Sequence, residues 1–199
     1  MEQLVTSSFR LGIIAGGQLG KMLSLAASNW DVKSYVLDPS DHAPAAPVAT
    51  KFVQGDYQDF DTVYEFGKMA HMVTLEIEHV NTDALIKLKK EGVKVLPDPE
   101  KVRLIKDKGL QKKQFTKAGI PSSEYILCKS SEEIRAKVEK GDIKIPFVQK
   151  QRQAGFDGRG VKVITSNKDM ENLLEGPSVI EKKEDSLKEI SIIVVRSTK

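Results

Sequence analysis

The stretch Gln149–Val161 reads Q-K-Q-R-Q-A-G-F-D-G-R-G-V, and its surroundings decide how the fold is interpreted. Ile143–Val148 before it is apolar and β-branched, and Val161–Ile164 after it alternates as a strand does. The two segments therefore predict the arms of a hairpin joined by a glycine-rich connection. Glycine permits positive φ angles and lets a backbone lie against a ligand, and successive amides in such a loop can form an anion-binding nest.

Charged side chains around this connection give a further reason to consider phosphate. Lysine offers a point charge and arginine a two-pronged donor. The residues concerned are Gly155, Gly158 and Gly160 in the loop, with Lys150, Arg152 and Arg159 around or inside it. A solvated hairpin tip with ordinary surface charges is the competing interpretation. Spacing alone leaves both open, because short glycine motifs occur in many unrelated loops.

The composition is that of an ordinary globular protein. The chain has 199 residues, 40% of them hydrophobic and 30% charged, with a net charge of +3, and this length allows one or two domains. So small a charge gives no argument for a nucleic-acid partner. Cys128 is the only cysteine, which indicates a reducing compartment and a buried side chain rather than a nucleophile. No apolar run reaches membrane-spanning length and the start has no signal-peptide core, so we expect a cytoplasmic protein without a membrane partner.

The first third of the chain predicts the start of a parallel α/β domain. A strand at Arg10–Ala15 runs into Gly16–Gly20, and a helix over Lys21–Ser28 follows, with four apolar residues on one face: Met22, Leu23, Leu25 and Ala26. A second strand, Lys33–Leu37, ends in Asp38, where a dinucleotide-binding fingerprint has the acid that holds a ribose hydroxyl. Ala15 stands at the first glycine position of that fingerprint, which weakens a nicotinamide interpretation. The helix N-terminus still suits a phosphate.

Polar residues follow another predicted strand, Met72–Leu75, at the end where ligands collect in a parallel sheet. Glu76 and Glu78 would share one face if the strand continued, and paired carboxylates can hold a sugar, a cation or an amine. The alternative is a solvated strand end with a helix cap near Asn81. His79 is only a weak indication of a metal, and we expect no metal ligands among these residues.

Pro97 and Pro99 interrupt regular structure and mark a predicted boundary, giving domains at 1–97 and 122–199 with a linking helical region at 98–121. In that region Lys108 and Lys112 fall on one helical face. The other predicted strands are Lys51–Gln54, Val93–Leu96, Tyr125–Leu127, Ser178–Glu181 and Glu189–Val195. The other predicted helices are Phe60–Ala70, Asn81–Lys90, Glu100–Lys117 as one helix or a pair, Ser130 or Ser131 to about Lys140, and Asn167–Leu174.

Taken together, these segments resemble one family over essentially the whole chain, the N5-carboxyaminoimidazole ribonucleotide synthetases of purine biosynthesis, which are ATP-grasp enzymes. The matching stretches are G-G-Q-L-G-K-M at Gly16–Met22, L-E-I-E-H-V at Leu75–Val80, D-K-G-L-Q-K-K at Asp107–Lys113, A-G-F-D-G-R-G at Ala154–Gly160, and V-I-E-K-K followed by E-I-S-I-I-V-V-R near the end. Several motifs in the same order are more specific than one glycine loop. The resemblance implies an α/β fold, with a Rossmann-like (preATP-grasp) parallel-sheet domain followed by a partial α+β ATP-grasp domain.

The resemblance also implies roles for individual residues. Lys108 and Lys150 would contact ATP phosphates, and Asp157 and Arg159 would lie where carboxylation occurs. The loop over the phosphates would comprise Gly155, Phe156, Asp157, Gly158, Arg159 and Gly160. The adenine hinge would comprise Glu181, Lys182, Lys183 and Glu184, with Glu189 on the ribose. Gly17, Gln18, Leu19 and Glu76 would face 5-aminoimidazole ribonucleotide. Two positions depart from the family pattern: Phe156 replaces a frequent tyrosine, and Lys108 replaces a frequent arginine, which removes bidentate phosphate geometry.

By the same resemblance, ATP and bicarbonate would give carboxyphosphate and ADP, and the substrate amine would then be carboxylated. Mg²⁺ would be required, with its ligands in a later portion of the family's sequence, and the full-length protein would be a homodimer. We therefore expect the 199-residue chain to be a truncated form without synthetase activity. The alternatives are another ATP-grasp ligase, such as formate-dependent glycinamide ribonucleotide transformylase, and a nicotinamide-dependent oxidoreductase or sensing module that uses Gly16–Gly20 and Asp38.

Overall fold

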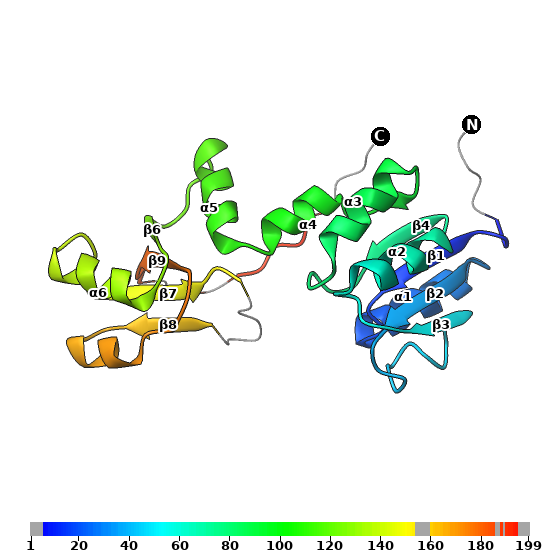
Figure 1. The fold of residues 1–199 in the computed structure, drawn as a ribbon, viewed down its shortest axis with the longest axis horizontal. Helices are drawn as coiled ribbons and strands as arrows, with labels where there is room; N and C mark the ends of the chain where they lie inside the picture. Colours follow the sequence, from blue (N-terminus) through cyan, green and yellow to red (C-terminus); the bar gives the residue numbers. More distant parts are fainter. Residues whose placement is uncertain (1–5, 154–159, 186–187, 189, 195–199) are drawn as a thin grey trace. The chain divides into compact units, whose positions relative to one another are not determined.

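The chain divides into two compact units, Met1–Asp107 and Lys108–Lys199. The computed structural model describes residues 6–153, 160–185, 188 and 190–194 (Figure 1). The division falls inside the segment 98–121 that the sequence predicts to link two domains.

The first unit is built on a five-stranded parallel sheet in the order β3-β2-β1-β4-β5. Its strands are β1 (Arg10–Ile14), β2 (Lys33–Asp38), β3 (Lys51–Gln54), β4 (Met72–Leu75) and β5 (Lys94–Val95). The chain leaves β1 towards β2 on one side and later returns to place β4 on the other side. The carboxyl ends of β1 and β4 therefore meet at a topological switch point, the usual place for a ligand in such a sheet.

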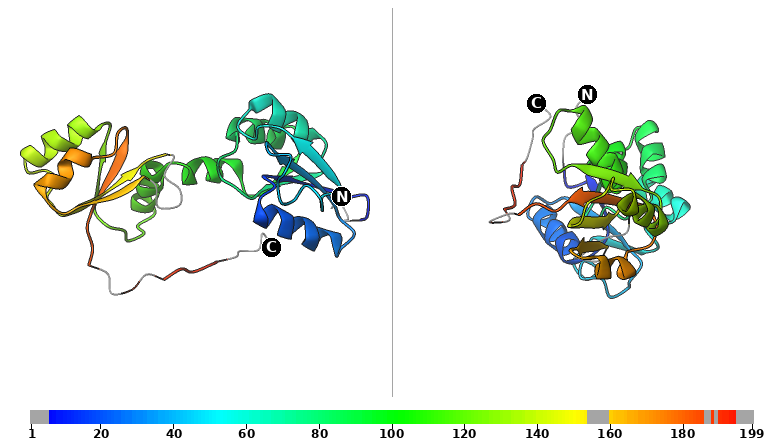
Figure 2. Two further views of the ribbon diagram at one scale, coloured as in Figure 1. Left: turned by 90° about the horizontal axis from the view of Figure 1, so that it is seen from below. Right: turned by 90° about the vertical axis from the view of Figure 1, so that its left-hand side faces the viewer.

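Helices cover both faces of this sheet, with α1 on one face and α2 and α3 on the other (Figure 2). The helices are α1 (Gln18–Ser28), α2 (Phe60–Lys68), α3 (Thr82–Lys90) and α4 (Pro99–Ile105). The larger core lies on the side of α2 and α3, where Phe66, Leu85 and Leu88 pack with the strand residues Ile14 and Val73, all at most 1% exposed. Burying side chains of this size is the main stabilising contribution to the unit.

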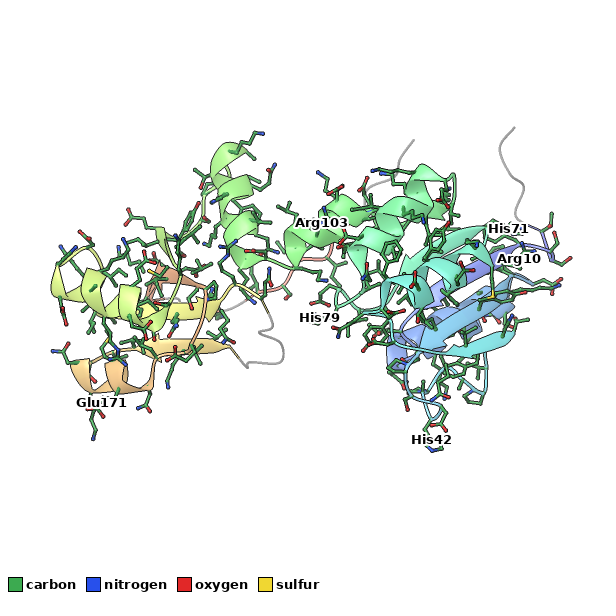
Figure 3. All side chains as sticks on the ribbon, in the orientation of Figure 1. Arg10, His42, His71, His79, Arg103 and Glu171 are labelled. Atoms are coloured by element: carbon green, nitrogen blue, oxygen red, sulfur yellow. The ribbon has the colours of Figure 1, made fainter. Side chains whose placement is uncertain are left out.

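Side-chain caps and one ion pair fix the ends of these helices. Asp59, Asn81 and Asp98 each accept a backbone N–H in the first turn of α2, α3 and α4 respectively. The predicted cap at Asn81 is thereby confirmed. Arg103 of α4 pairs with Asp83 of α3, which joins the last helix of the unit to its neighbour (Figure 3).

The apolar face of α1 does not pack on the sheet. Gly20 and Ser24 are the buried residues of this helix, whereas Leu19, Met22 and Leu25 are 55%, 56% and 47% exposed. The cause is close packing: a Cβ on Gly20 would lie only 2.5 Å from the carbonyl oxygen of Ala15. The side of α1 with small residues therefore rests on the strand, and its large apolar residues point outward.

The second unit contains a four-stranded antiparallel sheet in the order β6-β9-β7-β8. Its elements are α5 (Lys108–Lys117), β6 (Tyr125–Cys128), α6 (Ser131–Glu139), β7 (Phe147–Gln151), β8 (Val161–Ile164), the 3₁₀ helix η1 (Asn167–Asn172) and β9 (Ser178–Lys182). Ile134 of α6 and Met170 of η1 join Phe147, Ile164 and Ile180 in one buried cluster. Both helices therefore cover the same face of this sheet.

Three sequence predictions in the second half need correction. The strand predicted at Ile143–Val148 begins at Phe147 and continues to Gln151, since Pro146 has no N–H to donate to a ladder. The helix predicted at Asn167–Leu174 is a 3₁₀ helix that ends at Asn172. Residues 190–194, predicted as part of a strand, form none, because they pair with no other described strand, and Ile193 is 93% exposed.

Candidate functional site

The two faces of the second sheet differ in what covers them. Successive residues of a strand point to opposite faces, so the buried Phe147 and Gln149 face α6 and η1, while Lys150 faces the other way. On β9, Ile180 belongs to the buried cluster and Glu181 points to the opposite face, where α5 packs. The pairing of Val148 with Glu181 brings the two strands together at this point.

Glu181 holds two ammonium groups on this second face. Its Oε2 lies 2.6 Å from Lys150 Nζ, and its Oε1 lies 3.1 Å from Lys112 Nζ. The side chains of Glu181 and Lys112 are 10% and 12% exposed, whereas that of Lys150 is 32% exposed. Burial alone would raise the pKa of Glu181, but the hydrogen bonds from Lys150 and Lys112 outweigh it and lower that pKa. The carboxylate is therefore ionised at neutral pH, and Lys150 is the more exposed of its two partners.

The start of α5 lies beside the beginning of the glycine-rich connection. The backbone N–H of Lys108, the first residue of α5, donates to the carbonyl oxygen of Arg152 at 3.0 Å. Gly160 ends the connection with φ at +78°, a conformation that favours glycine, and its carbonyl oxygen accepts from the N–H of Gln151 at 2.8 Å. The predicted loop residues Gly155, Phe156, Asp157, Gly158 and Arg159 lie outside the described residues.

Apolar side chains lie next to Lys150 on the same face. Val161 pairs with Lys150 across the ladder and Val163 pairs with Val148, so the three valines share the face of Lys150. Val161 and Val163 are 41% and 47% exposed. An exposed apolar strip beside an ammonium group is suited to a flat, apolar ring that carries an anionic substituent.

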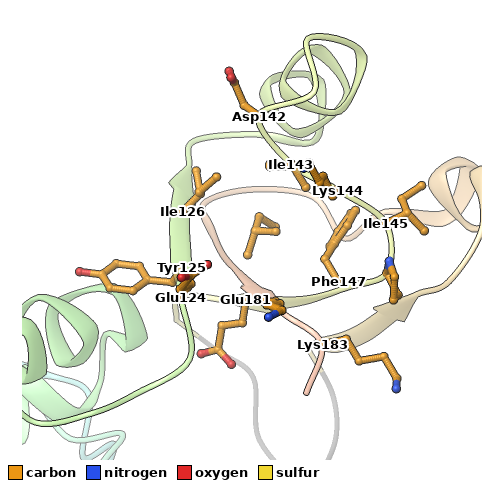
Figure 4. Close-up of a pocket in the computed structure, with 13 residues that line it drawn as sticks. Glu124, Tyr125, Ile126, Asp142, Ile143, Lys144, Ile145, Phe147, Glu181 and Lys183 are labelled. Carbon is orange, nitrogen blue, oxygen red and sulfur yellow. The ribbon is translucent and has the colours of Figure 1, made fainter. Parts of the chain in front are cut away.

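A separate pocket of about 570 Å³ opens at the end of β9 (Figure 4). Ile126, Ile143, Phe147 and Ile180 give it an apolar lining, and Glu181, Lys182 and Lys183 border it. Lys108, Lys112 and Lys150 are not among the lining residues, and the Glu181 carboxylate points away from Phe147. This pocket and the two lysines that pair with Glu181 thus lie on different sides of the strand.

The predicted hinge residues are placed at the end of β9. Lys182 is the last residue of the strand, and Lys183 and Glu184 follow it without regular structure. Glu184 is exposed, and Lys183 Nζ pairs with Asp185 at 2.6 Å. Glu189, predicted to hold a ribose, lies outside the described residues.

In the first unit, two of the predicted substrate residues lie together at the switch point. Gly17 is the N-cap of α1, and a Cβ built there would lie 3.4 Å from Glu76 Oε2. Gln18 begins the helix, and Leu19 follows it with a largely exposed side chain. Within the described residues no side chain caps the N-terminus of α1, and the first N–H groups of a helix have no intrahelical partner. The Glu76 carboxylate lies beside this N-terminus.

Acidic groups surround Glu76. Burial raises its pKa first, and the charges of Asp38 and Glu78 raise it further. The pKa of Tyr57 is raised as well, by burial and then by Asp38, Asp56 and Glu76. Sequence reasoning did not identify Tyr57, because only the fold brings the connection after β3 to the end of β4.

Asp38 has a structural role in this turn. Its Oδ2 accepts the N–H of Gly16 at 2.7 Å and its Oδ1 accepts the N–H of Ser40 at 2.9 Å. Both oxygens therefore hold backbone groups of the connections after β1 and β2. A ribose hydroxyl would have to compete with these bonds, which counts against the nicotinamide alternative.

Other groups with possible reactivity give no second site. The three histidines His42, His71 and His79 lie apart (Figure 3), and no three His, Cys, Asp or Glu residues in the described part of the chain are grouped to hold a metal ion. Cys128 is buried as predicted, and burial raises the pKa of its thiol to about 11. Within the described ranges, no helix combines the length and apolarity needed to cross a membrane.

Comparisons with known proteins identify two domains in this chain. Residues 9–106 match the ribonucleotide synthetase preATP-grasp domain, and residues 113–199 match the ATP-grasp domain. The phosphoribosylaminoimidazole carboxylase of Ogataea methanolica is 36% identical over 198 residues, which cover 94% of this chain and 36% of that protein.

Two solved structures show the same fold. N5-carboxyaminoimidazole ribonucleotide synthetase from Thermotoga maritima has a TM-score of 0.77 at 35% identity, covering 88% of this chain and 46% of that one. The synthase from Aspergillus clavatus, in complex with ADP and 5-aminoimidazole ribonucleotide, has a TM-score of 0.74 at 29% identity, covering 88% and 47%. The chain thus spans about a third to a half of the length of these relatives.

Proposed function

Because the chain belongs to the family of N5-carboxyaminoimidazole ribonucleotide synthetases within the ATP-grasp superfamily, we propose that its second unit binds ATP and its first unit binds 5-aminoimidazole ribonucleotide. The whole enzyme to which it corresponds is an ATP-dependent carbon–nitrogen ligase. In that reaction, ATP phosphorylates bicarbonate to carboxyphosphate, and the exocyclic amine of the ribonucleotide is then carboxylated, with release of ADP and phosphate.

The observation that carries the ATP proposal is the face of the second sheet that presents Lys150 and Glu181, called the cationic face below. Lys150 presents a partly exposed ammonium beside an apolar strip of valines, and Lys108 begins a helix whose N-terminus abuts the glycine-rich connection. Adenine packs against Val148, Val161 and Val163 in this proposal, and the phosphates contact Lys150 and Lys108. Cations and helix N-termini stabilise the charge that develops during phosphoryl transfer.

The residues assigned by family resemblance complete the proposal. Gly155–Gly160 cover the phosphates, Asp157 and Arg159 act at the carboxylation centre, residues 181–184 form the adenine hinge, and Glu189 holds the ribose. Mg²⁺ belongs to the same proposal, but the described residues gather no set of three His, Cys, Asp or Glu side chains for it. Cytoplasmic location is also part of the proposal.

In the first unit, Gly17, Gln18 and Leu19 at the start of α1 bind the phosphate or ribose of the ribonucleotide. A helix N-terminus without a side-chain cap attracts an anion, and Glu76 beside it accepts hydrogen bonds from the amine or a hydroxyl. The exposed apolar face of α1 supports homodimer assembly of the whole enzyme, because exposed apolar patches commonly mark interfaces.

Replacing Glu76 with glutamine separates its role in binding from its effect on stability. The pKa of Glu76 is higher in the folded chain than the unfolded value of about 4.5. The protonated group therefore stabilises the fold at low pH, and this contribution is lost as the pH rises through the folded-state pKa. Glu76→Gln should therefore stabilise the chain at pH 7 by about 0.5–2 kcal/mol, with no gain at pH 4. It should also weaken binding of 5-aminoimidazole ribonucleotide about tenfold or more, the loss of one charged hydrogen bond.

Urea unfolding at both pH values and titration with the ribonucleotide measure these effects. Glu65→Gln is the control, since Glu65 lies on the exposed side of α2 and pairs only with Lys68 among the described ion pairs. Unchanged ribonucleotide affinity in Glu76→Gln would remove Glu76 from the substrate site.

The nucleotide assignment is tested by calorimetric titration of the 199-residue chain with Mg-ATP and, separately, with NADH. ATP binding without NADH binding is the expected result. Binding of NADH without binding of ATP would favour the nicotinamide alternative, with the nucleotide at Gly16–Gly20.

A further inference from the structure

The pair of ammonium groups on Glu181 is asymmetric. Lys112 Nζ lies 3.1 Å from Glu181 and also donates to the carbonyl oxygen of Ser123 at 3.3 Å, and it lies 5.8 Å from the centre of the Tyr125 ring. Among the described residues, Lys150 Nζ hydrogen-bonds to Glu181 alone, at 2.6 Å. Lys112 is thus anchored on three sides, and Lys150 by one strong bond.

Binding of a phosphate by Lys150 would disturb this arrangement. An ammonium group that turns toward a phosphate weakens its bond to Glu181, whose side chain is only 10% exposed. A largely buried carboxylate that loses its partner is strongly unfavourable. If Lys150 were the sole partner of Glu181, the carboxylate would compete with the nucleotide for the same ammonium group.

We propose that Lys112 is a positioning residue for nucleotide binding: it keeps Glu181 paired from the side of α5, so that Lys150 can exchange its bond to Glu181 for a bond to a nucleotide phosphate. Lys112 itself does not contact the nucleotide. This inference rests on the proposed function, because it takes Lys150 as a ligand of ATP.

The geometry distinguishes this role from direct phosphate binding. Lys112 Nζ is held between the backbone of Ser123, the ring of Tyr125 and the carboxylate of Glu181, and its side chain is 12% exposed. It lies on the second turn of α5, four residues after Lys108. A shift toward a phosphate would leave both Ser123 and Glu181 without this donor.

A double-mutant cycle on the 199-residue chain tests the proposal, with Mg-ATP as the titrant. Lys112→Gln should weaken ATP binding about 5- to 20-fold in the wild-type background, because Glu181 then holds Lys150 alone. In the Glu181→Gln background, where no carboxylate competes for Lys150, the same change should alter affinity less than twofold. Lys112→Arg, which keeps the charge, should stay within about threefold of wild type.

Lys113→Gln is the matched control, since Lys113 is the next residue of α5 and is exposed. The ATP affinity of this variant should equal that of the wild-type chain. The pair Lys112→Gln with Glu181→Gln keeps two groups that can hydrogen-bond, so the comparison with Glu181→Gln stands even if Lys112→Gln alone folds poorly. Equal losses in both backgrounds, or no loss in either, would overturn the positioning role while leaving ATP binding intact. Absence of ATP binding by the wild-type chain would overturn the proposed function and this inference with it.

Discussion

Lys150→Ala should weaken ATP binding about 10- to 100-fold, which corresponds to about 1.5–3 kcal/mol for a hydrogen bond to a charged group. Of the two lysines that pair with Glu181, Lys150 is the more exposed, and it lies on the same face of the sheet as the three valines. The truncation should change stability little, because Glu181 keeps Lys112 as a partner at 3.1 Å and partly exposed ion pairs contribute about 0–1 kcal/mol.

Lys162→Ala is the matched control for this change. Lys162 lies on the neighbouring strand β8 and pairs with Gln149, so it belongs to the opposite face of the sheet. Its removal deletes one lysine from the same hairpin without touching the cationic face. Calorimetric titration of both variants with Mg-ATP makes the comparison, and equal ATP affinity in Lys150→Ala and wild type would remove Lys150 from the site.

Gly20→Ala should destabilise the first unit by about 1–3 kcal/mol, the usual cost of forcing extra volume into a packed site. Gly20 lies inside α1, where helix propensity alone would make alanine the better residue by up to about 1 kcal/mol. The added Cβ, however, would lie 2.5 Å from the backbone oxygen of Ala15, which cannot rotate away as a side chain would. Propensity and packing therefore predict opposite signs, and we expect packing to dominate.

Urea unfolding with hydrogen exchange of first-unit peptides measures this change. Ser28→Ala at the exposed end of α1 should stay within about 0.5 kcal/mol of wild type. A Gly20→Ala chain as stable as wild type, or more stable, would show that α1 can shift away from β1 without cost. Because Gly17 caps the same helix, the destabilised variant should also bind 5-aminoimidazole ribonucleotide more weakly.

The sequence predicts the order and type of most elements because their local signals agree. Short apolar runs mark β1 and β2, and caps at Asn81 and Ser130 mark where α3 and α6 begin. The signals fail where they conflict with packing. On α1, periodicity identifies the apolar face, but the close approach of Gly20 to Ala15 decides which face meets the sheet.

The candidate sites were predictable as residue types and less so as contacts. The family motifs name Lys150 and Glu181, which are 31 positions apart, but only the sheet order places β9 between β6 and β7 and joins their side chains. Helical spacing places Lys112 only on the same face of the helix as Lys108. Its bond to Glu181 depends on how α5 packs on β9, which no local pattern specifies.

Hydrogen exchange of the 199-residue chain with and without Mg-ATP tests the central claim most directly, because it locates the bound nucleotide. ATP should slow hydrogen exchange in peptides that cover β7, β9 and the first turn of α5. The exchange rate of peptides that cover Gly16–Gly20 should not change. Protection confined to Gly16–Gly20, or to the pocket lined by Ile143 and Phe147, would contradict a nucleotide site on the face of Lys150 and Glu181.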